Sequence, residues 1–218
     1  RKQGMNKLPK PYYQDNLVTI YHGDCAEIVP QLGRFDLLLT DPPYGIGQDG
    51  GAQRRRGSKK TNGPKMGWDA ERPAKEYFDI MIASTDNQII WGGNYFADFL
   101  PASRGWIYWH KLMGGDFSDG ELAWTSFDQV LKSITECNKS HGKVHPTQKP
   151  EAVIRFSVAY ATSKALVSTV LDPFMGSGTT LAVCRQEGIR SVGIDREEKY
   201  CDIARQRVQQ RSLFEVES

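Results

Sequence analysis

One short segment carries an unusual set of groups for a plain turn. It follows the apolar run 35–40 and reads Asp41-Pro42-Pro43-Tyr44. Because proline cannot continue a strand ladder, an apolar run that ends in a proline pair is typical of a buried strand opening into a loop. The carboxylate, the backbone carbonyls and the aromatic ring suit a planar group with an amine. An ordinary strand terminator with a surface tyrosine is the alternative.

A second segment has the composition of a nucleoside-binding turn. It follows the β-branched run 166–171, precedes a helix expected over 181–186, and reads Asp172-Pro173-Phe174-Met175-Gly176-Ser177-Gly178-Thr179-Thr180. A further strand over 191–194 ends at Asp195, about 20 positions beyond the first glycine. Glycines let a backbone approach a ligand, and an acid at the end of the next strand can bind both ribose hydroxyls. A generic strand–helix turn with an acidic cap is the alternative.

The glycine turn lacks two common phosphate-binding features. Leu181 stands where a pyrophosphate fingerprint has its third glycine, and no lysine follows the glycines as in a P-loop. These differences favour a nucleoside cofactor without phosphates. A nicotinamide dehydrogenase is an alternative that the glycine turn alone would allow, but it gives the segment 41–44 no role.

Alternating strands and helices are expected to position both segments. Strands are predicted over 17–21, 35–40, 88–91, 105–111, 121–127, 166–171 and 191–194, and helices from Asp24 to about residue 33 and over 71–83, 151–161 and 181–186. This order predicts an α/β fold with a mostly parallel, doubly wound sheet, Rossmann-like in its C-terminal half. Such sheets bind ligands at their carboxyl edge, where both segments are expected.

Length and charge indicate one soluble domain with a polyanionic partner. The chain has 218 residues, 39% of them apolar, and a formal charge of +2. One domain over 5–218 is expected, with residues 1–4 set aside. Much of the basic excess lies in a glycine-rich stretch, 45–70, which is predicted to be a mobile loop. Its basic residues include Arg54, Arg55, Arg56, Lys59 and Lys60.

Cysteine use and hydropathy indicate a cytoplasmic protein. The four cysteines show no Cys-x-x-Cys spacing and are expected to be free thiols. Cys137, His141 and His145 share a four-residue spacing, but no fourth ligand stands nearby, so no metal site is expected. No apolar run is long enough to span a membrane, so no membrane association is expected.

The two segments together resemble the amino-group DNA methyltransferases. Residues 172–178 look like the S-adenosylmethionine motif of that family, and residues 41–44 look like its catalytic motif. Their order, with the catalytic motif first, is similar to the circularly permuted β class of N6-adenine/N4-cytosine enzymes. Residues 22–25, 106–111 and 145–150 resemble further family segments, so the likeness spans about 17–208.

The resemblance implies a role for each residue of the catalytic motif. Asp41 and the Pro42 carbonyl would hold the exocyclic amine of a flipped base. Pro43 is the next residue of the motif, and Tyr44 would stack on that base. Asp at the first position resembles the adenine-N6 members, whereas cytosine-N4 members more often have Ser. The reaction implied is transfer of a methyl group from S-adenosylmethionine to adenine N6 in double-stranded DNA, with cytosine N4 as the alternative.

The resemblance also implies the cofactor contacts. Phe174 would pack on the cofactor adenine, Asp195 would bind the ribose, and Asp24 and Cys25 would lie near the adenine. Residues around the methionine end and in the turn itself would complete the site: Lys149, Pro150, Asp172, Pro173, Gly176, Ser177, Gly178 and Thr179.

The DNA contacts are the least specified part. The basic loop and Lys111 are predicted to contact DNA, and residues 112–144 are predicted to be a short target-recognition segment. A segment this short favours a small target site, additional DNA contacts from the basic loop, or a homodimer in which the second subunit contributes contacts. A cognate restriction endonuclease would be a further partner. An RNA base, a protein amide as substrate, and a catalytically silent nucleic-acid-binding relative are the alternatives.

Overall fold

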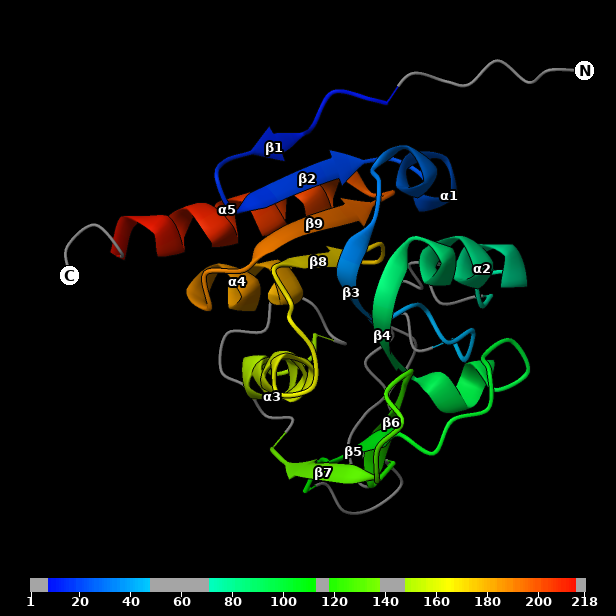
Figure 1. Ribbon diagram of the computed structural model, residues 1–218. Helices are drawn as coiled ribbons and strands as arrows, with labels where there is room; N and C mark the ends of the chain where they lie inside the picture. Colours follow the sequence, from blue (N-terminus) through cyan, green and yellow to red (C-terminus); the bar gives the residue numbers. More distant parts are fainter. Residues whose placement is uncertain (1–7, 48–70, 113–117, 138–147, 215–218) are drawn as a thin grey trace, which may run out of the picture.

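In the part of the chain that the structure describes, nine strands pair into one sheet (Figure 1). The computed structural model describes residues 8–47, 71–112, 118–137 and 148–214. The strands within these ranges are β1 (Tyr13–Gln14), β2 (Val18–His22), β3 (Phe35–Thr40), β4 (Thr85–Trp91), β5 (Trp106–His110), β6 (Gly120–Thr125), β7 (Lys132–Thr135), β8 (Thr169–Asp172) and β9 (Arg190–Asp195). Their order across the sheet is β1-β2-β9-β8-β3-β4-β6-β5-β7.

The middle of the sheet is parallel and its ends are mixed. Strands β2, β9, β8, β3 and β4 run parallel to one another. Strand β1 pairs antiparallel with β2, β6 pairs antiparallel with both β4 and β5, and β7 runs parallel to β5. The predicted α/β fold with a mostly parallel sheet is therefore confirmed.

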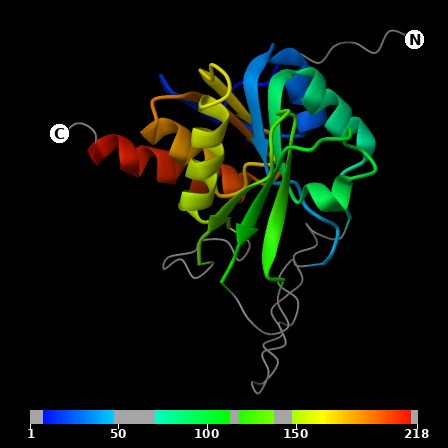
Figure 2. The same ribbon diagram turned by 60° about the horizontal axis from the view of Figure 1, so that its bottom comes forward.

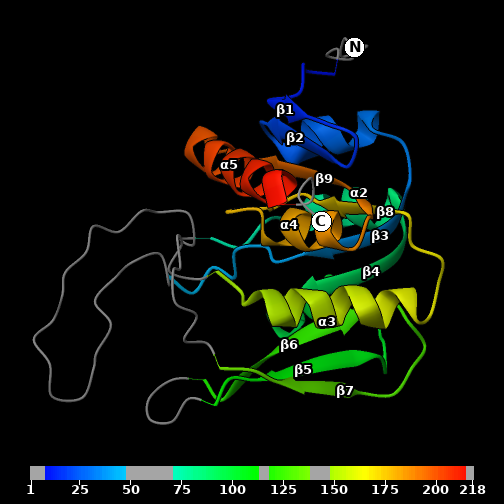
Figure 3. The ribbon, with the colours of Figure 1, turned by 90° about the vertical axis from the view of Figure 1, so that its left-hand side faces the viewer.

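Helices cover both faces of this sheet (Figures 2 and 3). They are α1 (Cys25–Ile28), α2 (Lys75–Ala83), α3 (Glu151–Thr162), α4 (Thr179–Gln186) and α5 (Glu198–Phe214), with 3-10 helices at Val29–Gln31 and Gly93–Phe96. Figure 3 shows α3, α4 and α5 in front of the strands, whereas α1 and α2 lie on the opposite face. The doubly wound arrangement explains why the central strand β3 reads as an almost continuous apolar run.

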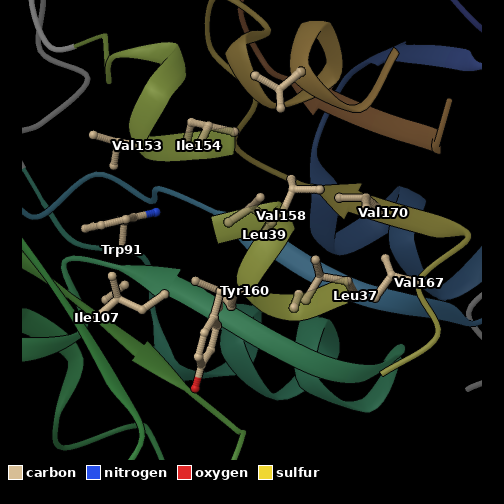
Figure 4. Close-up of a cluster of buried hydrophobic side chains, with 14 of the residues drawn as sticks. Leu37, Leu39, Trp91, Ile107, Val153, Ile154, Val158, Tyr160, Val167 and Val170 are labelled. Carbon is tan, nitrogen blue, oxygen red and sulfur yellow. The ribbon is translucent and has the colours of Figure 1, made fainter. Parts of the chain in front are cut away.

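Strand β3 shows how one run of residues serves two cores. Leu37 and Leu39 point to the face covered by α3, where they pack with Val153 and Val158 (Figure 4). Leu38 points to the other face and packs with residues of α2. All three leucines are fully buried, as the period-two geometry of a strand between two helix layers requires. Packing on both faces therefore fixes the position of β3 and of the first residues of the loop that follows it.

The predicted recognition segment 112–144 is partly built into the sheet. Gly120–Thr125 forms β6, close to the strand expected over 121–127, and Lys132–Thr135 forms β7 at the sheet edge. Strand β7 was not predicted, because Ile134 is the one apolar residue in a polar sequence. Residues 113–117 and 138–147 lie outside the described part, and a role in recognition stays a prediction. None of the helices described here is long and apolar enough to cross a membrane.

Candidate active site

The proposed amine clamp, residues 41–44, begins where β3 ends. Both oxygens of the Asp41 carboxylate have a partner: Oδ1 accepts a hydrogen bond of 2.6 Å from the Tyr44 hydroxyl, and Oδ2 lies 2.5 Å from Lys149 Nζ. Lys149 Nζ also donates to the Tyr44 hydroxyl at 3.0 Å. The clamp is therefore held by an ammonium group from the segment just before α3, more than 100 residues along the chain.

The ring of Tyr44 is packed between aromatic residues and a glycine. Tyr95 stacks on it with a centroid distance of 4.7 Å and an interplanar angle of 17°, and Phe96 meets it edge-on. Gly92 has φ +70°, and a Cβ on it would lie 2.0 Å from Tyr44 Cε1. Position 92 thus requires glycine both for its backbone conformation and for the close approach of the ring.

We expect Gly92→Ala to destabilise the protein much more than Gly188→Ala. Gly188 has nearly the same φ, +68°, but a Cβ there meets no atom within 4 Å. Gly188→Ala should therefore cost only the left-handed backbone penalty, about 1–2 kcal/mol. Gly92→Ala adds a clash with Tyr44, which makes the loss of unfolding free energy larger. Urea denaturation of both variants measures the difference, and equal losses would contradict the packing role of Gly92.

A cavity of about 380 Å³ opens beside the clamp. Its lining comes from the ends of β8 and β9, the loops after β2, β3, β8 and β9, the segment before α3, and the helices α1, α3, α4 and α5. The lining residues are Gly23, Cys25, Asp41, Pro43, Gln148, Lys149, Ile154, Asp172, Pro173, Phe174, Met175, Gly176, Ser177, Thr179, Thr180, Asp195, Arg196, Glu197 and Tyr200. The clamp and the glycine turn therefore share one cavity.

The cavity lies where the direction of chain winding reverses. Strand β3 leads through α2 to β4 on one side, and β8 leads through α4 to β9 on the other. The neighbouring ends of β3 and β8 are also bonded, because Thr40 Oγ1 donates to Asp172 Oδ1 at 2.8 Å. A switch point of this kind is the usual ligand-binding position in an open α/β sheet.

Two carboxyl groups of the cavity have raised pKa values. Burial raises the pKa of Asp172 to about 6, although hydrogen bonds from Thr180, Thr40 and the Phe174 amide oppose the shift. Burial likewise raises the pKa of Asp195 to about 6. The Asp195 carboxylate accepts hydrogen bonds from the backbone amides of Gly176, at 3.1 Å, and Glu197, at 2.8 Å. Both acids therefore change charge near pH 6 and are acceptors at neutral pH.

Most of the predicted cofactor residues lie around this cavity. Those that line it are Cys25, Lys149, Asp172, Pro173, Phe174, Gly176, Ser177, Thr179 and Asp195. Burial raises the pKa of the Cys25 thiol to about 12, so this group stays neutral and is a poor nucleophile. Whether each residue contacts a cofactor stays a prediction.

Three predicted cofactor residues support the cavity without lining it. Asp24 is the N-cap of α1, where it accepts from the Ala26 amide at 2.9 Å, and it also pairs with Arg196. Pro150 is the N-cap residue of α3. Gly178 precedes α4 with φ +73°, and a Cβ there would lie 2.7 Å from the Ala204 Cβ. These residues fix the helix starts around the cavity.

Glu121 is a partly buried member of the site that the sequence did not indicate. Its Oε2 lies 2.9 Å from Lys149 Nζ and its Oε1 lies 2.5 Å from Lys111 Nζ. Burial raises the pKa of Glu121, but the two ammonium groups outweigh burial and lower it to about 2. Its position in a short, partly polar strand gave no signal, because its partners are distant in the sequence.

The structure gives Lys111 a partner inside the protein. Its side chain is only 13% exposed and forms the ion pair with Glu121. The other predicted DNA contacts, Arg54, Arg55, Arg56, Lys59 and Lys60, lie outside the described residues. Within the described ranges no group of three or more His, Cys, Asp or Glu side chains could hold a metal ion.

The chemistry of the cavity fits a nucleoside cofactor without phosphates. Gly176 has φ +50°, and a Cβ on it would meet no protein atom within 4 Å, so the turn leaves room for a ligand to approach its backbone. The two cations that line the cavity are already paired, Lys149 with Asp41 and Glu121, and Arg196 with Asp24. The volume is also within the range of about 300–1,000 Å³ typical of small-molecule sites.

Comparisons with known proteins agree with this geometry. A family described as "DNA methylase" matches residues 118–206. The Type II methyltransferase M2.DpnII of Streptococcus pneumoniae is 26% identical, over 95% of this chain and 96% of the relative. M2.LlaDCHI of Lactococcus lactis subsp. cremoris is 23% identical, over 98% of this chain and 97% of its own. The crystal structure of the M1.HpyAVI–SAM complex superposes with a TM-score of 0.61 at 23% identity, covering 88% of this chain and 99% of that one.

The likeness to this solved structure concerns the fold. The family match and the two curated relatives make the chain similar to amino-group DNA methyltransferases. The alignment with M2.LlaDCHI extends over 272 positions, more than the 218 residues of this chain. The relative therefore has segments for which this chain has no counterpart.

Proposed function

We propose that this protein transfers a methyl group from S-adenosylmethionine to N6 of an adenine flipped out of double-stranded DNA. The observation that carries the proposal is the shared cavity, which Asp41 and Pro43 line together with Phe174 and Gly176. A base amine held at residues 41–44 would thus face a cofactor held at the glycine turn. Adenine is preferred because the catalytic motif begins with Asp.

The cofactor would be held by residues of the glycine turn and of β9. Asp195, an acceptor at neutral pH, would bind the ribose hydroxyls, and the Phe174 ring would pack against the adenine. Asp172 and Lys149 would lie around the methionine end. When bound, S-adenosylmethionine supplies an electrophilic methyl group on its sulfonium sulfur.

The clamp would act on a poor nucleophile. The lone pair of an aryl amine is delocalised into the ring, so the nitrogen is flat and weakly nucleophilic. Asp41 and the Pro42 carbonyl would accept its two N–H bonds and favour a pyramidal nitrogen, and Tyr44 would stack on the base. An activated serine or cysteine is not required, and catalysis would come mainly from alignment.

Charge would complete the role of Asp41. Positive charge develops on the amine nitrogen as its bond to the methyl carbon forms, and a carboxylate at hydrogen-bond distance stabilises that charge. Asp41 would also be able to accept the proton that the nitrogen loses afterwards. Burial raises the pKa of Asp41, the Lys149 ammonium lowers it in part, and Glu121 raises it.

Identification of the methylated product tests this proposal. The protein is incubated with methyl-labelled S-adenosylmethionine and unmethylated duplex DNA, which is then digested to nucleosides and analysed by mass spectrometry. We expect labelled N6-methyladenine. Labelled N4-methylcytosine would correct the base, label on RNA or protein alone would overturn the DNA substrate, and no label on any substrate would indicate a catalytically silent relative.

The DNA contacts of the basic loop and the partners beyond DNA stay predictions. Contacts from Arg54, Arg55 and Arg56 would make DNA binding weaken steeply with added salt, because each neutralised phosphate releases counterions. The short recognition segment, 112–144, supports a small target site or contacts supplied by a second copy of the chain. A cognate restriction endonuclease and a cytoplasmic location belong to the same proposal.

A further inference from the structure

Lys149 competes with the substrate for Asp41. The proposed function, on which this inference rests, needs an Asp41 oxygen to accept a bond from the target amine. Yet Oδ1 is engaged by Tyr44 and Oδ2 by Lys149, at 2.6 and 2.5 Å. An ammonium group at 2.5 Å is a stronger partner than a neutral amine. Asp41 can therefore serve the amine well only if Lys149 has another acceptor.

Glu121 is that second acceptor. Its Oε2 lies 2.9 Å from Lys149 Nζ, and the Tyr44 hydroxyl lies 3.0 Å from the same nitrogen. The Lys149 side chain is only 6% exposed, and its ammonium stands 5.3 Å from the ring centre of Trp91. These neighbours form a cage that can keep the ammonium in place when its contact with Asp41 loosens.

Lys111 fixes Glu121 from the opposite side. Its Nζ lies 2.5 Å from Glu121 Oε1, whereas Oε2 has Lys149 Nζ at 2.9 Å and accepts from the Tyr44 hydroxyl at 3.3 Å. The cluster thus contains two carboxylates and two ammonium groups. A shift of Lys149 from Asp41 toward Glu121 keeps the ammonium ion-paired. The Asp41 carboxylate then has the Tyr44 hydroxyl and the target amine as hydrogen-bond donors, which limits the cost of the shift.

We propose that Glu121 is a positioning residue for methyl transfer. It keeps the Lys149 ammonium in place while Asp41 accepts a hydrogen bond from the target amine, and Lys111 holds the Glu121 carboxylate in position. Glu121 acts through Lys149 and does not itself contact the base. Its removal therefore affects the transfer step more than the binding of cofactor or DNA.

A double-mutant cycle tests this assignment. The variants are Glu121→Gln, Lys149→Met and the double variant, with Glu187→Gln as a matched control because Glu187 belongs to an exposed ion pair with Arg155 and does not line the cavity. The readouts are the single-turnover rate of methyl transfer to unmethylated genomic DNA at saturating S-adenosylmethionine, the Kd of the cofactor, and the temperature of unfolding.

We expect Glu121→Gln to slow transfer on the order of tenfold or more, while the cofactor Kd stays within about threefold of the wild-type value. The double variant should be no slower than Lys149→Met alone, because Glu121 has no function without Lys149. Glu187→Gln should match the wild type. If Glu121→Gln does not fold, Lys111→Met, which loosens Glu121 from outside, should reproduce the slow transfer.

Three results would overturn the assignment. The first is a wild-type transfer rate in Glu121→Gln or, where that variant does not fold, in Lys111→Met. The others are rate losses that multiply in the double variant, and a loss of cofactor affinity as large as the loss of rate. Each would make Glu121 a structural member of the cluster only. Absence of DNA methylation by the wild-type protein is a different outcome, since it contradicts the proposed function itself.

Discussion

Asp41→Ala is expected to lower the rate of methyl transfer by about 10³-fold or more, while cofactor affinity stays within a fewfold of the wild-type value. The substitution removes the carboxylate that would hold the amine and stabilise its developing charge. It should not unfold the protein, because Lys149 keeps its ion pair with Glu121. Single-turnover transfer and equilibrium binding of S-adenosylmethionine measure the two effects separately.

Asp41→Asn is the matched control for the role of charge. An amide oxygen still accepts one hydrogen bond but carries no charge, so this variant should transfer faster than Asp41→Ala and slower than the wild type. If alanine at position 41 lowered transfer less than tenfold, or weakened cofactor binding as much as a change at Asp195, the proposed division between clamp and cofactor site would be wrong.

Asp195→Ala should have the opposite profile. We expect cofactor affinity to fall about 10- to 100-fold, the loss of one or two charge-assisted hydrogen bonds, whereas the transfer rate at saturating cofactor changes little. The carboxylate also organises the turn, because it accepts from the amides of Gly176 and Glu197. Calorimetric titration with S-adenosylmethionine measures the affinity.

The pH dependence of binding separates these roles further. The pKa of Asp195 is raised to about 6, so its carboxylate is ionised at pH 7.5 and protonated at pH 5. Wild-type affinity for the cofactor should therefore fall as the pH drops through about 6. Asp172, whose pKa is also raised to about 6, contributes part of this fall. Asp195→Asn should show a shallower dependence, and a dependence as steep as in the wild type would exclude Asp195 as its source.

Much of the fold could be predicted from local patterns. The apolar run that forms β3 and the β-branched run before Asp172 indicated buried parallel strands, because a strand covered on both faces has no polar alternation. A proline pair and a glycine turn then marked the ends of β3 and β8. Since both strands run in the same direction, their ends had to meet at one edge, and the shared cavity lies there.

The partners of the buried charges could not be predicted. Lys149 contacts Asp41, from the loop after β3, and Glu121, from β6. Lys111 was predicted from the sequence to contact DNA, because its ion pair with Glu121 could not be inferred there. Such contacts depend on how distant elements pack, and local propensity contains no information about them. The same holds for Tyr95, whose stacking on Tyr44 follows from the path of the loop after β4.

A crystal structure of the protein with S-adenosylhomocysteine, the cofactor without its methyl group, would show directly whether one cavity serves both the base and the cofactor. We expect the adenosine to pack against Phe174 with its ribose at Asp195, and the sulfur atom to face Asp41 across the shared cavity. A cofactor bound outside this cavity, or one whose sulfur points away from Asp41, would contradict the claim that the ends of β3 and β8 form a single methyl-transfer site.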